Sequence, residues 1–258
     1  MSESPVLLSV VDGLARITLN RPARMNAFEQ SMAHAWAEAT AAATSRDDVH
    51  AILIDAAGPS FCAGGDVLAM AHGMSDFTIE ELAHAINNGI RALVESSIPV
   101  VAAAHGTTAG GGLGILLASD YVIIGENSKI GSLYANIGLT PDLSVSASLA
   151  KAVGERRALQ LVLTDRLLSA EQALDWGLVA EVVAADEVQA RAEEVAQSWL
   201  AGAAGAYGQA KRLIRTQPSR TFAEQLDEEA RSINAALQTP EAQARVQAFA
   251  DRSARKAK

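Results

Sequence analysis

Two glycine-rich stretches decide the fold: Phe61-Cys62-Ala63-Gly64-Gly65-Asp66 and His105-Gly106-Thr107-Thr108-Ala109-Gly110-Gly111-Gly112-Leu113-Gly114. Each follows a short apolar run typical of a buried strand, and each leads into a predicted helix. Because glycine has no Cβ, its N–H can approach a ligand closely, and a helix N-terminus adds positive partial charge. Two such turns facing each other supply two N–H groups to one oxygen, an oxyanion hole. For either stretch alone, a tight turn without a ligand is the simpler interpretation.

Outward from these turns, the sequence predicts alternating strands and helices up to about residue 190. Asp12-Gly13 between two β-rich runs indicates a hairpin, and Ser31 is predicted to cap the helix that follows it. Strand, helix and strand in succession imply crossover connections and a mainly parallel sheet. The predicted strands are residues 6–11, 14–19, 51–55, 99–104, 121–125 and 178–183, and the predicted helices are 31–43, 80–95, 113–119, 143–153, 155–163 and 170–176.

The last part of the chain shows helical patterns alone. Further helices are predicted at residues 187–201, 206–215, 222–237 and 240–252. We therefore expect an α/β fold with two regions, an α/β core at residues 1–190 and a helical region at residues 191–258.

The composition indicates a folded, acidic protein. Of its 258 residues, 49% are hydrophobic and 20% charged, which excludes a disordered chain. Lys and Arg number 21 and Asp and Glu 30, so the net charge is −9, which argues against nucleic acid or a membrane surface as partner. Residues 96–119 carry no charge, but Pro99 and the glycines at 110–112 favour a strand, a turn and a buried helix over a membrane span.

The cysteine and histidine content excludes several kinds of site. Cys62 is the single cysteine, so no internal disulfide can form and a cytoplasmic location is expected. The N-terminus lacks the pattern of a signal peptide. The five histidines show no metal-ligand spacing, so no metal site is expected. No G-x-G-x-x-G, P-loop or G-x-S-x-G motif is present, and Cys62 is expected to be a buried apolar residue.

Together these motifs resemble the crotonase (enoyl-CoA hydratase/isomerase) superfamily over about residues 6–250. The resemblance implies an α/β fold with a crotonase-like spiral of ββα units and a helical C-terminal region that assembles a homotrimer or hexamer. It also implies an acyl-CoA thioester substrate and no cofactor, because coenzyme A is part of the substrate. The segments that carry it are Asn20-Arg21-Pro22-Ala23-Arg24-Met25-Asn26-Ala27, Phe61-Cys62-Ala63-Gly64-Gly65-Asp66, residues 109–114, Gly154-Glu155-Arg156-Arg157-Ala158, Leu168-Ser169-Ala170-Glu171-Gln172-Ala173 and Trp176-Gly177-Leu178-Val179.

The resemblance also implies roles for individual residues. The family's oxyanion donors fall on Gly65 and Gly111, whose N–H groups would stabilise an enolate. Asp66 is expected mainly to cap the helix that it begins. The substrate pocket is expected to include Tyr134, Leu133 and Gly112, and the CoA-binding residues Ala23, Arg24, Ala63, Asp66 and Val67, with Arg21 also near the phosphates.

The carboxylates that are present favour one reaction class. Hydratases of the family use two glutamates, and those positions here are Gly114 and Tyr134, a phenol with a pKa of about 10 and therefore a poor base. Asp142 aligns with the catalytic aspartate of the Asp-dependent enoyl-CoA isomerases. One carboxylate can carry a proton between two carbons, so the resemblance favours a double-bond isomerase with Asp142 as proton shuttle. From the residues alone, Asp142 is an N-cap of the helix at 143–153.

Three alternatives remain open. The first is an enoyl-CoA hydratase (lyase) with an atypical acid/base set. The second is an enzyme similar to 4-chlorobenzoyl-CoA dehalogenase, in which an aspartate aligned with Asp142 attacks an aromatic ring; its helper histidine falls at about Arg91. The third is a non-catalytic acyl-CoA-binding subunit. His105 replaces the family's usual asparagine and is expected to be a hydrogen-bonded structural residue.

Overall fold

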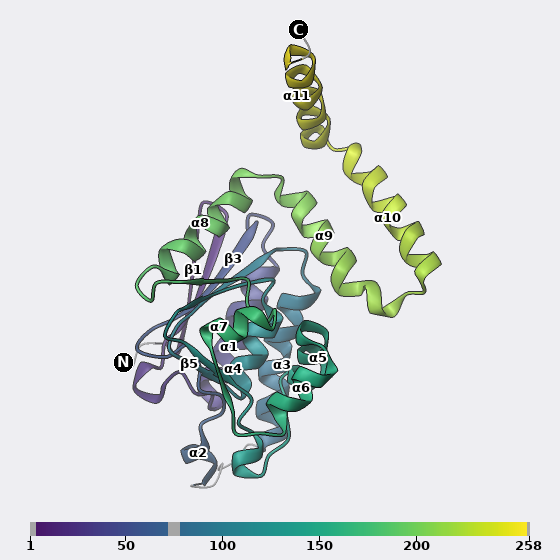
Figure 1. Ribbon diagram of the computed structural model, residues 1–258. Helices are drawn as coiled ribbons and strands as arrows, with labels where there is room; N and C mark the ends of the chain where they lie inside the picture. The colour runs from purple at the N-terminus through teal and green to yellow at the C-terminus, as the bar shows by residue number, and fades with distance from the viewer. Residues whose placement is uncertain (1–3, 72–77, 257–258) are drawn as a thin grey trace.

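The computed structural model describes residues 4–71 and 78–256, which form a mixed α/β fold (Figure 1). The main sheet has the strand order β1-β2-β3-β4-β6-β9. β1 and β2 form the predicted antiparallel hairpin, and the other neighbouring pairs are parallel, so the predicted crossovers are confirmed. The strands are β1 (Val6–Val11), β2 (Leu14–Leu19), β3 (Ala51–Ala56), β4 (Val100–Ala104), β6 (Tyr121–Gly125) and β9 (Glu181–Val183).

The central strands are buried on both faces, which explains why their sequences are continuous apolar runs. In β3, Ile52 and Ile54 belong to one core cluster, whereas Leu53 belongs to another on the opposite face. Helices α1 (Gln30–Thr44) and α3 (Ile79–Glu95) contribute to the first cluster, and α8 (Val188–Ala201) contributes to the second. Because α8 packs on the sheet, the packed body continues beyond residue 190; the division into regions 1–190 and 191–258 stays a prediction.

A second sheet holds three strands of three residues each, in the order β5-β7-β8. They are β5 (Thr107–Ala109), β7 (Lys129–Gly131) and β8 (Leu167–Ser169). The sequence did not predict them because three residues are too few to show an alternating pattern. β5 lies within the second glycine-rich stretch and pairs with β7, so this sheet fixes the position of the turn after β4.

The uncharged stretch at residues 96–119 forms β4, β5 and α4 (Gly111–Ala118), as the strand, turn and helix prediction requires. No helix within residues 4–71 and 78–256 is long and apolar enough to cross a membrane.

Two predicted helix starts are wrong. Ser31 does not cap α1; the cap is Glu29, whose carboxylate accepts the backbone N–H groups of Ser31 at 3.0 Å and Met32 at 3.1 Å. The helix predicted from residue 143 begins at Val145, because Leu143 and Ser144 adopt left-handed φ angles of 48° and 69°. The other helices of the body are α2 (Val67–Ala71), α5 (Val145–Val153), α6 (Glu155–Val162) and α7 (Ala170–Asp175), with 3-10 turns η1 (Pro22–Arg24) and η2 (Ala135–Ile137).

The C-terminal helices leave the body of the molecule after one anchored helix. α9 (Ala204–Thr216) is held by Lys211, which is buried and donates to the carbonyl oxygens of Leu93 and Ile98 at 2.8 and 2.6 Å. Lys211 also forms an ion pair with Asp120 at 2.9 Å. Beyond the 3-10 turn η3 (Gln217–Ser219), α10 (Phe222–Leu237) and α11 (Pro240–Lys256) stand clear of the sheets (Figure 1).

One face of α10 exposes four large apolar side chains, which we refer to as the α10 stripe: Phe222, Leu226, Ile233 and Leu237, with exposed fractions of 77%, 49%, 73% and 48%. Their spacing places them on one side of the helix. An apolar helix face of this kind is usually buried against a partner. The α10 stripe therefore supports the expected assembly through the helical region.

We predict that the protein is a homotrimer or hexamer and that Ile233→Asp lowers its mass in solution. A charge at the centre of the α10 stripe would have to be desolvated in any interface that buries the stripe. Light scattering coupled to size exclusion should give three or six times the monomer mass for the wild type and a smaller mass for Ile233→Asp. Asn234→Asp, one residue along, is the matched control and should keep the wild-type mass. A monomeric wild type would contradict this prediction.

Candidate active site

The two glycine-rich turns lie against each other, as the sequence predicted. Cys62 of the first turn pairs with β5 of the second: its N–H donates to the carbonyl of Thr107 at 3.4 Å, and its carbonyl accepts the N–H of Ala109 at 3.0 Å. Gly64 has a φ of +104°, and a Cβ placed on it would lie 3.2 Å from the backbone nitrogen of Gly111. The close approach therefore requires glycine at this position.

Gly65 and Gly111 line the same cavity. Gly111 is the first residue of α4, so its N–H has no acceptor within that helix. Across the described ranges, neither N–H donates a hydrogen bond to a protein acceptor. Both residues line a cavity of about 530 Å³. The arrangement has the features of an oxyanion hole: two backbone donors without a protein acceptor, a helix N-terminus and a cavity large enough for a ligand.

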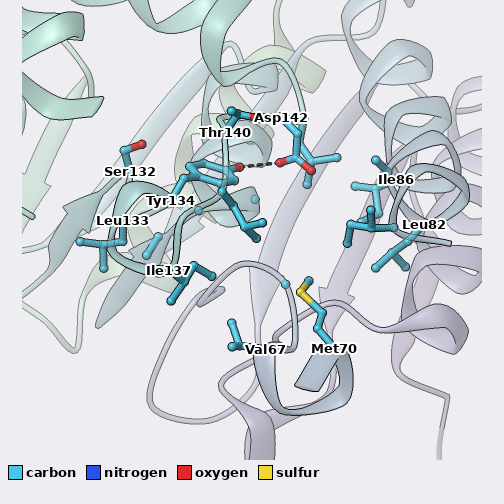
Figure 2. Close-up of a pocket in the computed structure, with 18 of the residues that line it drawn as sticks. Val67, Met70, Leu82, Ile86, Ser132, Leu133, Tyr134, Ile137, Thr140 and Asp142 are labelled. Atoms are coloured by element: carbon cyan, nitrogen blue, oxygen red, sulfur yellow. Dashed lines mark hydrogen bonds between the residues drawn. The ribbon is translucent and has the colours of Figure 1, made fainter. Parts of the chain in front are cut away.

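Apart from the two turns, the cavity walls are mostly apolar and come from three segments (Figure 2). Leu82 and Ile86 project from α3, Val67 and Met70 from α2, and further side chains from the loop that ends at residue 143. Met70 was missed by the sequence analysis because a five-residue helix carries little periodicity. Leu82 and Ile86 recur at helical spacing within the predicted helix at residues 80–95, and nothing in that spacing distinguishes a core face from a cavity wall.

Asp142 and Tyr134 form a hydrogen-bonded pair in this cavity (Figure 2). The Tyr134 hydroxyl donates to Oδ1 of Asp142 at 2.6 Å. Burial raises the pKa of the Asp142 carboxyl above its ordinary value, and the hydrogen bond from Tyr134 partly offsets this rise. Burial and the neighbouring Asp142 charge raise the pKa of Tyr134, so its phenol is neutral. The pair therefore consists of a carboxyl group with a raised pKa, Asp142, and a neutral phenol, Tyr134, that donates a hydrogen bond to it.

The backbone around Asp142 places its side chain in the cavity and rules out the predicted N-cap. Asp142 lies before two left-handed residues, Leu143 and Ser144, and its carbonyl oxygen, not its carboxylate, accepts the N–H of Val145 at 2.9 Å. The residue in the N-cap position of α5 is Ser144, which makes no side-chain cap bond. Non-glycine residues in the left-handed region each cost about 1–3 kcal/mol and are concentrated at functional sites.

The same loop fills the space beside Gly114. The carbonyl oxygen of Leu143 overlaps the position that a Cβ on Gly114 would take, and the Leu143 Cβ lies 3.0 Å from it. Any side chain at position 114 therefore displaces the main chain that holds Asp142.

Two of the predicted pocket residues line the cavity and one does not. Leu133 and Tyr134 both line it. Gly112 does not: it is buried in α4, where a Cβ would collide with the carbonyl of Cys62, so its role is close packing between the two turns. Cys62 is buried as predicted, its Sγ donates to the carbonyl of Asn26 at 3.1 Å, and burial raises the pKa of its thiol to about 12.

The expected CoA-binding residues divide into two groups. Ala63 and Val67 line the cavity, and Ala23 and Arg24 are exposed on η1. The carboxylate of Asp66 binds groups of this chain: Oδ1 accepts the Ala69 N–H at 3.1 Å, as a helix cap does, and Oδ2 accepts a hydrogen bond from Arg21 at 3.0 Å.

Arg21 and His105 both have structural roles. Arg21 also donates to the carbonyl of Ala27 at 2.6 Å, so its guanidinium links the first turn to the segment around residue 27. His105 has Nε2 2.7 Å from the carbonyl oxygen of Gly58, which confirms the predicted structural hydrogen bond. Within the described residues, no group of three or more His, Cys, Asp or Glu side chains could hold a metal ion.

We predict that Gly114→Ala destabilises the protein. The added methyl overlaps the Leu143 carbonyl, and such overpacking costs about 1–3 kcal/mol, more than the up to about 1 kcal/mol that alanine gains over glycine in a helix. The matched control is Gly205→Ala on α9, where nothing lies within 4 Å of the new Cβ. Denaturant unfolding should show a loss for Gly114→Ala and no loss for Gly205→Ala. Equal effects would contradict this explanation.

We also predict that Asp142→Asn stabilises the protein at neutral and higher pH. Burial raises the folded-state pKa of Asp142, so its stabilising contribution is present below the unfolded pKa and is lost as the pH rises through the folded pKa. Thermal unfolding at about pH 8 should therefore give a higher Tm for Asp142→Asn than for the wild type, with the difference shrinking towards about pH 4. A difference that grows on acidification would contradict the prediction.

Comparison with known proteins identifies the family. A sequence model of the family described as enoyl-CoA hydratase/isomerase matches residues 10–257. The 1,2-epoxyphenylacetyl-CoA isomerase of Escherichia coli is 30% identical over 232 residues, 86% of each chain. A probable enoyl-CoA hydratase of Mycobacterium tuberculosis is 35% identical over 189 residues, 73% of each chain.

A solved structure shows the same fold. The crystal structure of a Mycobacterium abscessus protein described as an enoyl-CoA hydratase/isomerase matches with a TM-score of 0.88 at 32% identity, over 96% of each chain. The crotonase-like α/β fold is therefore confirmed. Relatives of similar identity carry the names of isomerases, hydratases and dehalogenases, so names alone do not select a reaction. Since the family's sequence pattern and fold both extend along nearly the whole chain, this protein is an enzyme of the enoyl-CoA hydratase/isomerase family.

Proposed function

We propose that the protein is an acyl-CoA double-bond isomerase in which Asp142 carries the proton. The observation that supports this most directly is the position of one half-buried carboxylate, Asp142, in the cavity that Gly65 and Gly111 also line. The other carboxylate on the described cavity wall, Glu80, is largely exposed and lies 3.5 Å from Nε2 of His84. The E. coli relative is also named an isomerase.

The reaction uses the residues as follows. The thioester carbonyl oxygen accepts the N–H groups of Gly65 and Gly111, which makes the neighbouring carbon acidic and stabilises the enolate that forms. Asp142 removes a proton from one carbon, and the electron pair of that C–H bond enters the dienolate. The protonated Asp142 returns the proton to a carbon two positions away, and the C=C bond shifts. Substrate and product are isomers, so no water, metal or cofactor is consumed.

Hydration is the less supported alternative. It requires an acid and a base on a water molecule, and at the first of the two positions for such groups, Gly114, the Leu143 main chain occupies the space that a side chain needs. Tyr134 stays a neutral phenol because burial and Asp142 raise its pKa. The dehalogenase-like alternative is weaker still, because Arg91, at the helper position, is exposed on α3 and is not among the residues that line the cavity.

The CoA half of the substrate would extend from the cavity past the first turn. Ala63 and Val67 line the cavity, and Arg24 on η1 is an exposed cation in the segment that the family resemblance assigns to CoA binding. We assign the phosphates to Arg24 rather than Arg21, since Arg21 is already bound to Asp66 and Ala27. Ala23 and the capping Asp66 shape this surface through the backbone.

Asp142→Ala tests the proposal. The variant should lose about 10²- to 10⁴-fold in kcat on a 3-enoyl-CoA, the usual contribution of a positioned general base, whereas Glu80→Gln should retain most activity. Conversion to the 2-enoyl-CoA would be followed by its ultraviolet absorbance. Chromatography with mass detection would separate substrate from product and show that both have the same mass. Unchanged activity of Asp142→Ala would remove Asp142 from the mechanism. Rapid hydration of crotonyl-CoA by the wild type would favour a hydratase, and binding of CoA esters without turnover would favour a non-catalytic subunit.

A further inference from the structure

We propose that Tyr134 is a positioning residue that restrains Asp142, so that a single carboxylate oxygen exchanges protons with the substrate. The inference rests on the proposed isomerase function. It goes beyond that function because it assigns the two oxygens of Asp142 different tasks.

The contact between the two side chains is short and enclosed. Tyr134 is 9% exposed, and its hydroxyl reaches across the turn η2 to Oδ1 of Asp142 at 2.6 Å. The other carboxylate oxygen lies on the side turned away from the tyrosine ring, towards Leu82 and Ile86 (Figure 2). A phenol has one hydrogen to donate, so the bond to Oδ1 leaves Oδ2 as the oxygen that is free to accept a proton.

The surroundings offer Asp142 no competing charged partner. Among the described residues that line the cavity, none is Lys, Arg or His, and Glu80 on α3 is the other ionisable carboxylate. Cys62 lies close enough to Tyr134 to interact with it electrostatically, and its buried thiol is neutral because its pKa is about 12. Tyr134 is therefore the side chain that restrains the direction of Asp142, and its hydrogen bond partly offsets the rise in the pKa of Asp142 that burial causes.

A proton shuttle with one base depends on such a restraint. The carboxylic acid formed after proton removal has to keep the proton until the dienolate accepts it at the second carbon. A carboxyl group that rotates freely can offer the proton to water instead. With Oδ1 bonded to the tyrosine hydroxyl, the acid holds its proton on Oδ2, which faces the substrate. The hydrogen bond also stabilises the ionised form of Asp142 against the effect of burial.

Tyr134→Phe tests the inference because it removes only the hydroxyl. We expect a lower kcat with a nearly unchanged KM, and the acidic limb of kcat/KM should move to higher pH, since loss of the hydrogen bond raises the pKa of Asp142. With substrate deuterated at the carbon that loses the proton, the fraction of deuterium returned to the product should fall. Ile137→Val, a cavity residue on the same loop, is the matched control; it should affect KM and leave the pH limb and the deuterium transfer unchanged.

A second measurement separates this inference from the proposed reaction. Carboxyl ¹³C NMR of Asp142, assigned with Asp142→Asn, gives its titration midpoint without turnover. The midpoint should rise in Tyr134→Phe. If the midpoint rises but the wild type shows no isomerase activity, the proposed reaction is wrong and the restraint of Asp142 by Tyr134 is supported. If the wild type isomerises, but the midpoint and the deuterium transfer are the same in Tyr134→Phe, the restraint is overturned and the reaction stands.

Discussion

The backbone contact between the two glycine-rich turns is the constraint on which the rest of the site depends. Cys62 pairs with β5, and Gly64 approaches the nitrogen of Gly111 so closely that a Cβ is excluded. This contact brings the ends of β3 and β4 together at one cavity, with the N-terminus of α4 behind it. Gly112 contributes to the same contact from inside α4, against the Cys62 carbonyl. The glycines thus shape the main chain first, and the two free N–H groups result from that shape.

Around this fixed centre, the loop from β7 to α5 determines the chemistry. It brings a half-buried carboxylate, Asp142, to the cavity that Gly65 and Gly111 also line, and it supplies Tyr134 as that carboxylate's partner. The two left-handed residues of the loop and the partial burial of the Asp142 carboxylate are both unfavourable for stability. A protein retains such features where function requires them. A helix cap requires neither left-handed residues nor a partly buried acid.

Much of the fold can be predicted from the sequence, because its main strands and helices are long enough to show a pattern. The hairpin at Asp12-Gly13 and the buried β3 and β4 are examples. The three-residue strands of the small sheet are too short to show a pattern. The N-cap of α1 was also missed, because the sequence favours Ser31 as the cap and the structure uses Glu29. In the site, Gly65, Gly111 and Tyr134 could be placed by resemblance. The prediction that Asp142 is a helix N-cap was wrong, because a sequence pattern carries no information on the left-handed turn at residues 143 and 144.

The overlap of the Leu143 carbonyl with the space beside Gly114 also bears on how reaction types diverge within the family. In sequence, this chain differs from a two-glutamate chain at positions 114 and 134, where it has glycine and tyrosine. The backbones must differ as well. A glutamate at position 114 needs space that the peptide of Leu143 occupies in this chain, so a two-glutamate chain requires a different loop there. A protein engineer who wishes to convert this site would therefore have to remodel residues 142–145 before changing any acid or base.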